Sequence, residues 1–223
     1  MLHPDRPASQ WWPPTSTERG TSRSLPAMPE TSYHRGIYPV ALARRKDGWV
    51  AVVEAQSGVL LANVTDSLAL VGVSPVAEAA GIAQPKVIVS RDRAFVVWSR
   101  EGGTRSKKLA FVLLSFSGQA LSKLGTAGAE VELISRPINL DDGGFAVAWI
   151  ESGTELHVGR WNAAGDLVAA VLVQPQNVAA SAALALGRDA SGLIVAFEDS
   201  SRYPYTLVTR HIDVSALAPA TRP

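Results

Sequence analysis

Histidines are the first side chains to consider for acid–base catalysis or metal binding, and the chain has four of them: His3, His34, His157 and His211. None of them has an acid or a second histidine at the spacing of a known metal-binding motif, and the chain has no cysteine. We therefore expect no metal site and no cofactor. Gly-x-Ser-x-Gly, phosphate-binding and dinucleotide motifs are also absent, so the sequence favours a protein that is not an enzyme.

Four aspartates recur where we predict turns between strands. Calcium would be one explanation for such a set, but calcium takes about six to eight oxygen ligands and each turn supplies a single carboxylate. Aspartate beside glycine is also typical of hairpin turns, because both residues tolerate the backbone angles that these turns require. We therefore interpret the set as turn residues: Asp47, Asp92, Asp142 and Asp189.

Charged and aromatic side chains gather in a few predicted loops, and these form the candidate binding surface. Tyr203 and Tyr205 closely follow Arg202, a combination that suits a sugar ring or a peptide through stacking and hydrogen bonding. Loops that only keep the surface solvated are the alternative explanation. The candidate binding residues are Arg100, Arg105, Arg136, Glu151, Glu198, Arg202, Tyr203 and Tyr205.

A repeating unit of strands must position these loops. A short apolar motif recurs about every 50 residues, each time after an apolar strand and a turn, and a third strand and a weaker fourth strand follow it. One short helix is predicted, from Val76 to Ala83. The four expected units are residues 36–82, 83–134, 135–180 and 181–218.

The motif strands are apolar on both faces. In the third unit, Phe145, Val147 and Trp149 alternate with Ala146 and Ala148. A sheet with one solvated face should alternate apolar with polar residues, so these sheets must be covered on both sides. Radially stacked blades meet that condition, and a β-sandwich is the alternative fold. We predict an all-β protein of four propeller-type blades, as a four-bladed ring or as part of a larger propeller.

The third unit carries the clearest motif, Gly-Gly-Phe-x-Val-x-Trp at residues 143–149, with Asn-x-x-Gly after the next strand. This pattern resembles the blade repeats of bacterial propeller-forming surface and secreted proteins. The resemblance covers residues 37 to about 214 and implies a propeller fold, but no catalytic residue. No fourth strand follows Ile212, and residues 24–33 are a candidate to supply one. An incomplete ring would favour self-association.

One turn suggests an enzyme instead. Ser90, Asp92 and Trp98 are similar to the Ser-x-Asp-x-Gly-x-x-Trp turns of sialidases, which are also propellers. Ala94 replaces the glycine, and Trp98 lies one place late. Sialidases also need an arginine cluster and a Tyr/Glu nucleophile pair. Here these would have to come from Arg35, Arg136 and Arg202, from Tyr38 or Tyr205, and from Glu151 or Glu198.

Composition excludes several classes of protein. With 21 Lys+Arg against 20 Asp+Glu, the formal net charge is +1, which gives no electrostatic reason to expect a nucleic-acid partner. No segment reaches the roughly 20 apolar residues of a membrane helix, so we expect no membrane insertion. Residues 1–35 hold 6 of the 14 prolines and no aliphatic run, which predicts a flexible leader before a repeat domain over 36–223.

These features predict a non-catalytic binding or scaffold module whose loop face takes a glycan, peptide or protein partner. The alternatives are a sialidase-like glycoside-processing enzyme or its remnant, and a fragment of a larger propeller without independent function. The absence of cysteine and the repeat resemblance favour an exported or cell-surface bacterial protein, although no secretion signal is visible.

Overall fold

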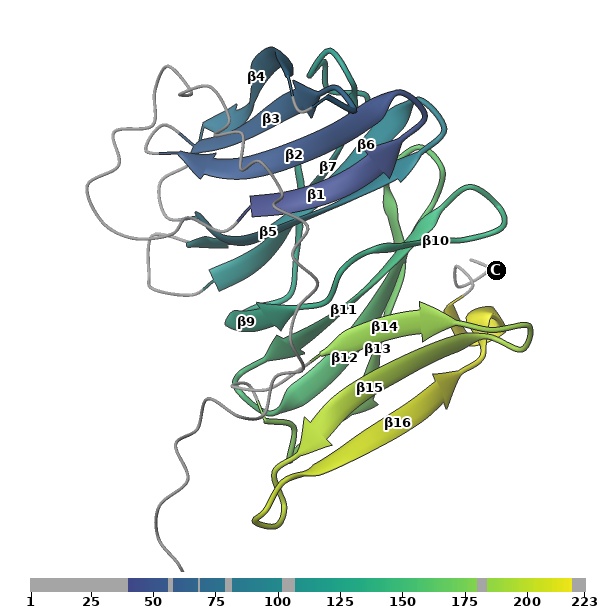
Figure 1. The fold of residues 1–223 in the computed structure, drawn as a ribbon. Coiled ribbons are helices and arrows are strands. Elements are labelled where there is room, and N and C mark those ends of the chain that lie inside the picture. The colour runs from purple at the N-terminus through teal and green to yellow at the C-terminus, as the bar shows by residue number, and fades with distance from the viewer. Residues whose placement is uncertain are drawn as a thin grey trace, which may run out of the picture.

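In the computed structural model of the protein, four antiparallel β-sheets follow one another along the chain (Figure 1). No helix in the part of the chain that the structure describes is long and apolar enough to cross a membrane. The predicted leader and its candidate closing strand lie outside the described residues, as do His3, His34, Arg35, Tyr38 and Arg105. The described residues are 40–55, 58–67, 69–78, 82–101, 107–179 and 184–217.

The strands appear in the predicted order within each sheet. The first sheet contains β1 (Val40–Arg45), β2 (Gly48–Ala55), β3 (Gly58–Val64) and β4 (Leu70–Glu78). The second contains β5 (Ile82–Ser90), β6 (Arg93–Glu101), β7 (Lys107–Ser115) and β8 (Gly125–Ala127). The third contains β9 (Val131–Ile134), β10 (Ile138–Asn139), β11 (Phe145–Glu151), β12 (Glu155–Trp161) and β13 (Leu167–Gln174). The fourth contains β14 (Ala185–Arg188), β15 (Leu193–Asp199) and β16 (Thr206–Ile212).

The first strand of the third sheet is broken in two. Both β9 and β10 pair with β11, and residues 135–137 separate them. The Ser135 N–H donates to the Ala148 carbonyl at 2.9 Å, and the Ser135 Oγ accepts from the Ala148 N–H at 2.9 Å. Pro137 has no N–H to donate, so the chain leaves the regular ladder here. β9 and β10 together take the place of one first strand.

The central strands bury both of their faces, as predicted. In β11, Ala146, Ala148 and Ile150 pack in the core shared with the fourth sheet, whereas Val147 and Trp149 pack in the core shared with the second sheet. All five side chains are at most 1% exposed. Because a neighbouring sheet covers each face of β11, neither face needs polar residues.

Aromatic rings fill the space between the second and third sheets. Phe95 stacks on Phe145 with ring centroids 4.4 Å apart. The Trp161 ring lies 5.6 Å from that of Phe95 and 5.1 Å from that of Phe111. Each buried ring of this size contributes roughly 1.5–3 kcal/mol through the area it removes from water. This cluster fixes the second and third sheets relative to each other.

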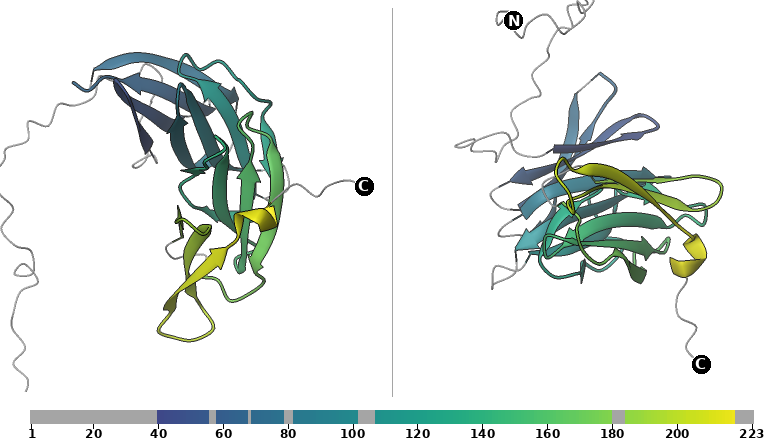
Figure 2. Two further views of the ribbon diagram at one scale, coloured as in Figure 1. Left: turned by 90° about the vertical axis from the view of Figure 1, so that its right-hand side faces the viewer. Right: turned by 90° about the horizontal axis from the view of Figure 1, so that it is seen from below.

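The four sheets form an open arc. The first sheet lies at one end and the fourth at the other, and the side view shows the same curvature (Figure 2). Sheets stacked in series around a common centre define a propeller-type fold, which confirms the predicted class and excludes the β-sandwich. Self-association through the two end sheets stays a prediction.

The fourth sheet has three strands within the described residues. After β16 the chain forms a short 3-10 helix, η2 (Val214–Leu217), and the buried Leu217 joins the core between the third and fourth sheets. Among the described residues after Ile212, the chain therefore forms a 3-10 helix, and the absence of an outer strand beyond it stays a prediction.

The predicted helix from Val76 to Ala83 is wrong. β4 continues to Glu78, and β5 begins at Ile82. Ala77 pairs with Val59 in the neighbouring strand, so the sheet already satisfies the backbone of this segment. Pairing within a sheet outweighs a short local pattern that resembles a helix.

Candidate functional site

Two loops lie at one end of the sheets, which we call the loop end. They are the β11–β12 turn (152–154) and the β15–β16 loop (200–205), both toward the left of Figure 1. The segment between the third and fourth sheets joins them. The Val178 N–H donates to the Thr154 carbonyl at 3.2 Å, and the Asn177 carbonyl accepts a hydrogen bond from the second loop at 2.7 Å. These bonds give the loop end a defined shape.

Two tyrosines project from the second loop into solvent. Tyr203 is 91% exposed and Tyr205 is 48% exposed. Their rings meet edge to face with centroids 6.1 Å apart. At the base of the loop, the Ser201 N–H donates to Asp199 at 2.8 Å, and this bond lowers the pKa of the Asp199 carboxyl below its ordinary value. The predicted binding residues that the structure brings to the loop end are Glu151, Glu198, Arg202, Tyr203 and Tyr205.

The other predicted binding residues do not lie on these two loops. Arg100 is half-buried near the end of β6, at the position of the second sheet that corresponds to Glu151. Arg136 lies at the break between β9 and β10 and donates to the Leu42 carbonyl of β1 at 3.4 Å. It therefore connects the third sheet to the first rather than facing the loop end. Arg105 lies outside the described residues.

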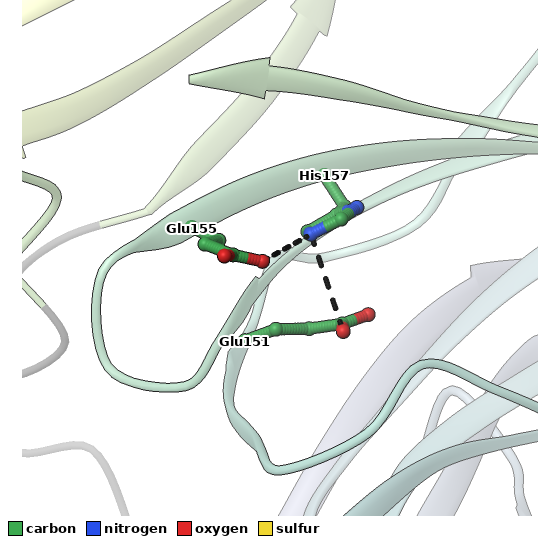
Figure 3. A group of neighbouring side chains, drawn as sticks. All are labelled: Glu151, Glu155 and His157. Atoms are coloured by element: carbon green, nitrogen blue, oxygen red, sulfur yellow. Dashed lines mark hydrogen bonds and ion pairs between the residues drawn. The ribbon is translucent and has the colours of Figure 1, made fainter. Parts of the chain in front are cut away.

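Three titratable side chains, the Glu–Glu–His cluster, converge beside the β11–β12 turn (Figure 3). Glu151 comes from the end of β11, and Glu155 and His157 come from β12. His157 Nε2 lies 3.4 Å from a Glu155 carboxylate oxygen and 4.0 Å from a Glu151 carboxylate oxygen. One donor atom from each residue lies within 4.8 Å of the other two. This spacing is short enough for the three side chains to share one cation.

Neighbouring groups hold the cluster in place. The Trp149 indole stacks on the His157 imidazole, with centroids 5.6 Å apart and planes 13° apart. Trp149 Nε1 donates to Glu151 Oε1 at 2.6 Å, and the Ala129 N–H donates to Glu151 Oε2 at 3.2 Å. Trp149 is 1% exposed, so the cluster is anchored to the core between the second and third sheets.

The expectation that no histidine has an acid at ligand spacing is wrong for His157. Glu155 and His157 are two residues apart on one strand, so their side chains share a face of the sheet. That alternation is visible in the sequence and could have been recognised. Glu151 joins them because it pairs directly with Glu155 across the hairpin. The length of the turn sets this pairing, and the sequence motifs did not reveal it.

A cleft of about 320 Å³ lies at the opposite end of the third and fourth sheets, which we call the turn end. Two of its acids are paired with arginines. Arg160 Nη2 lies 2.6 Å from Asp142, and Arg188 Nη1 lies 2.6 Å from Asp141. The hydrogen bond from Arg160 is the main cause that lowers the pKa of Asp142. Carboxylates held in the ionised form do not serve as general acids near neutral pH.

A serine, a histidine and an aspartate also meet at the turn end. Ser191 Oγ lies 2.9 Å from His211 Nε2 and donates to Asp189 Oδ1 at 2.7 Å. These contacts and backbone N–H groups lower the pKa of Asp189 to about 2. A nucleophilic serine would donate to the histidine, and the aspartate would accept from the other ring nitrogen. Asp189 therefore acts as a turn residue, as predicted.

Neither a family model nor a curated protein matches the sequence. Solved structures with a similar fold include "Hadza microbial sialidase Hz136", with a TM-score of 0.51 and 12% identity over 77% of this chain and 43% of that one. An endo-arabinase from Bacteroides thetaiotaomicron has a TM-score of 0.49 and 10% identity over 83% of this chain and 78% of that one. An alpha-L-arabinofuranosidase from Clostridium thermocellum has a TM-score of 0.46 and 8% identity over 86% of this chain and 72% of that one.

The arrangement of the four sheets places the chain in the β-propeller fold class, and the similarity to the sialidase structure supports this at the level of the fold. At these identities the similarity extends to the fold alone. The chain spans less than half the length of the sialidase that it resembles. The propeller resemblance expected from the sequence is confirmed at the level of the fold.

Proposed function

We propose that this chain is a non-catalytic binding module whose loop end recognises a carbohydrate. The observation that carries the proposal is the exposure of Tyr203 and Tyr205, which stand edge to face at the tip of one loop. Aromatic rings that project into solvent cost free energy unless a ligand covers them, and sugar rings stack well on such rings. Arg202 directly precedes Tyr203 in sequence and supplies hydrogen-bond donors for hydroxyl or carboxylate groups.

The state of the acids at the turn end argues against catalysis there. Glycoside hydrolysis needs one carboxyl group that stays protonated near neutral pH and a second that is ionised. At the turn end, the pKa values of Asp142 and Asp189 are both lowered by their hydrogen bonds. Neither group therefore meets the requirement for a general acid. We interpret the charged groups of this cleft as contacts that stabilise the fold.

Glycans are the first ligand class to test because one of the structures with a similar fold is a sialidase. Bacterial blade repeats of the Gly-Gly-Phe-x-Val-x-Trp type remain part of the proposal, since the motif at residues 143–149 carries that similarity. An extracellular glycan would also agree with an exported or cell-surface protein.

A glycan array followed by calorimetric titration of the best ligand tests this function. We expect Tyr203→Ala to weaken binding by at least about tenfold, because one stacking platform is lost. Leu172→Ala is the matched control: Leu172 is 50% exposed and belongs to β13 of the third sheet, not to the β15–β16 loop. An array without any ligand, or equal weakening by both substitutions, would overturn the proposal.

Glycoside hydrolysis at the loop end is the second candidate function. The specific observation is that carboxylate oxygens of Glu151 and Glu155 lie within 4.8 Å of each other. Retaining glycosidases place their two carboxyl groups about 5–5.5 Å apart. If the candidate is right, the wild-type protein should release sugar from arabinan or from sialosides, and Glu155→Gln should abolish that turnover. A wild-type protein with no turnover on either substrate removes this candidate.

A further inference from the structure

The Glu–Glu–His cluster carries an inference that is independent of carbohydrate recognition. We propose that Glu151, Glu155 and His157 bind one divalent transition-metal ion of the zinc class. All three side chains are partly buried and come from a single hairpin of the third sheet (Figure 3).

The distances within the cluster suit such an ion. Zinc binds nitrogen and oxygen donors at about 2.0–2.2 Å, so two ligands at a tetrahedral angle lie about 3.3–3.5 Å apart. His157 Nε2 and the Glu155 oxygen are 3.4 Å apart. The Glu151 oxygen, at 4.0 Å from the same nitrogen, needs a shift of only about half an ångström to meet this geometry.

The donor types select the class of ion. One imidazole nitrogen and two carboxylate oxygens make a mixed set that suits zinc and neighbouring transition metals. Calcium and magnesium prefer oxygen ligands alone, and calcium takes about six to eight of them. Three protein ligands leave a fourth position for water. Glu155 is 41% exposed, so solvent reaches the cluster from its side.

Charge also favours a cation here. Within the described residues, the ion pairs of Glu151 and Glu155 are both made with His157, and neither pairs with a lysine or an arginine. Two carboxylates this close repel each other, and a divalent ion between them would neutralise both. The acids at the turn end differ in this respect, because Asp141 and Asp142 each have an arginine partner.

Two ligands are already oriented. Trp149 Nε1 donates to Glu151 Oε1, and the Ala129 N–H donates to Oε2, which is also the oxygen that lies toward His157. Stacking on Trp149 fixes the plane of the imidazole, so that Nε2 faces both carboxylates. Partners of this kind, which hold the ligands from outside, are typical of metal sites and strengthen binding.

The repeated frame of the fold does not require these residues. In the second sheet, Trp98 occupies the position of Trp149, as judged from the pairing of the strands. The positions that correspond to Glu151, Glu155 and His157 there carry Arg100, Lys108 and Ala110. The second sheet is as well buried without the cluster, so the cluster is a feature added to one blade.

Calorimetric titration of the full-length, metal-stripped protein with zinc chloride tests the proposal. We expect one equivalent to bind, and cobalt(II) in its place to develop the visible absorption of a low-symmetry site. Glu155→Gln and His157→Ala should each weaken binding by at least about 100-fold, because outer-shell changes alone cost about 10–100-fold. His211→Ala is the matched control, since His211 also faces a carboxylate, Asp189, at 3.5 Å but has no second acid beside it within the described residues.

Several outcomes would overturn the proposal. They are the absence of zinc binding to the wild-type protein, undiminished binding in the two ligand variants, and equal loss in His211→Ala. Circular dichroism must show that the variants fold, and if His157→Ala does not, the partly exposed Glu155→Gln carries the test. Tyr203→Ala should leave zinc binding unchanged, so failure of carbohydrate recognition and failure of the metal site are distinguishable.

Discussion

The second and third sheets share one frame but differ in chemistry at the same place. Trp98 in β6 and Trp149 in β11 occupy equivalent positions, and each is at most 1% exposed in the core that its sheet shares with the preceding one. The Trp149 N–H donates to Glu151, whereas the buried Trp98 N–H has no hydrogen-bond partner among the described residues. Both sheets therefore use the indole ring for packing. Of the two sheets, only the third has an acid that accepts a hydrogen bond from the indole N–H.

Removing either indole should produce the largest effect. We expect Trp98→Ala and Trp149→Ala each to lower the free energy of unfolding by about 3–5 kcal/mol, because both leave a large cavity between two sheets. Urea denaturation followed by circular dichroism measures this loss. A loss below about 1 kcal/mol for either variant would contradict burial of the sheets on both faces.

Replacing each indole by a smaller ring should destabilise the protein by different amounts in the two sheets. Trp149→Phe leaves the Glu151 carboxylate without its donor, whereas Trp98→Phe removes an N–H that has no partner among the described residues. The loss of unfolding free energy should therefore be about 1–3 kcal/mol greater for Trp149→Phe. The same denaturation experiment checks this difference. Equal losses would mean that the Glu151 contact contributes nothing to stability.

Two glycines near the third sheet allow a test of whether the backbone holds the Glu151 carboxylate in place. Gly128 and Gly143 have φ angles of +68° and +80°, so an alanine at either position is strained by about 1 kcal/mol. A Cβ at Gly128 would also overlap the Glu151 carboxylate, but a Cβ at Gly143 would meet only Ala163, at 3.7 Å. Gly128→Ala should therefore cost more than Gly143→Ala and should also weaken zinc binding.

Thermal melts of the two variants, together with zinc titration, measure these effects. The tryptophan bands of the near-ultraviolet circular dichroism spectrum should change in Gly128→Ala, because the added methyl group lies beside Trp149, and should not change in Gly143→Ala. If the two substitutions cost the same and leave zinc binding equal, the backbone at Gly128 does not hold the Glu151 carboxylate in place.

The smallest expected effect lies at the turns of the two sheets. The folded pKa of Asp142 is lowered, mainly by Arg160, so its charge contributes stability above the ordinary pKa of 3.8, and this contribution is lost as the pH falls through the folded pKa. Asp142→Asn should cost less than about 1 kcal/mol at pH 7, because the side chain is 46% exposed. This cost should shrink as the pH falls from 3.8 through the folded pKa.

Asp92→Asn is the comparison from the second sheet. Asp92 is 86% exposed and lies 3.8 Å from Arg93, so its removal should change stability less than Asp142→Asn at pH 7. Urea denaturation of both variants and the wild type at pH 7 and pH 3 checks the order. A pH-independent cost for Asp142→Asn would show that geometry, and not charge, makes its contribution.

Much of the frame could be predicted from local sequence. Apolar residues on both faces of 145–150 required a neighbour on each side, and glycine beside aspartate marked the turn before the strand. The failure at Val76–Ala83 came from a short pattern that a helix and a strand can share, and pairing with β3 decided it. The exposed tyrosines were also predictable, because a charged and aromatic loop has no place in the core.

The sequence by itself determined the repeat, the strands and the turns, since these depend on residues close together in the chain. The tertiary structure alone decided that Glu151 meets Glu155 and His157, that an indole orders them, and that the sheets end in an open arc. The physical reason is that the register of a hairpin and the stacking of sheets depend on contacts between distant residues. A local pattern restricts such contacts but does not specify them.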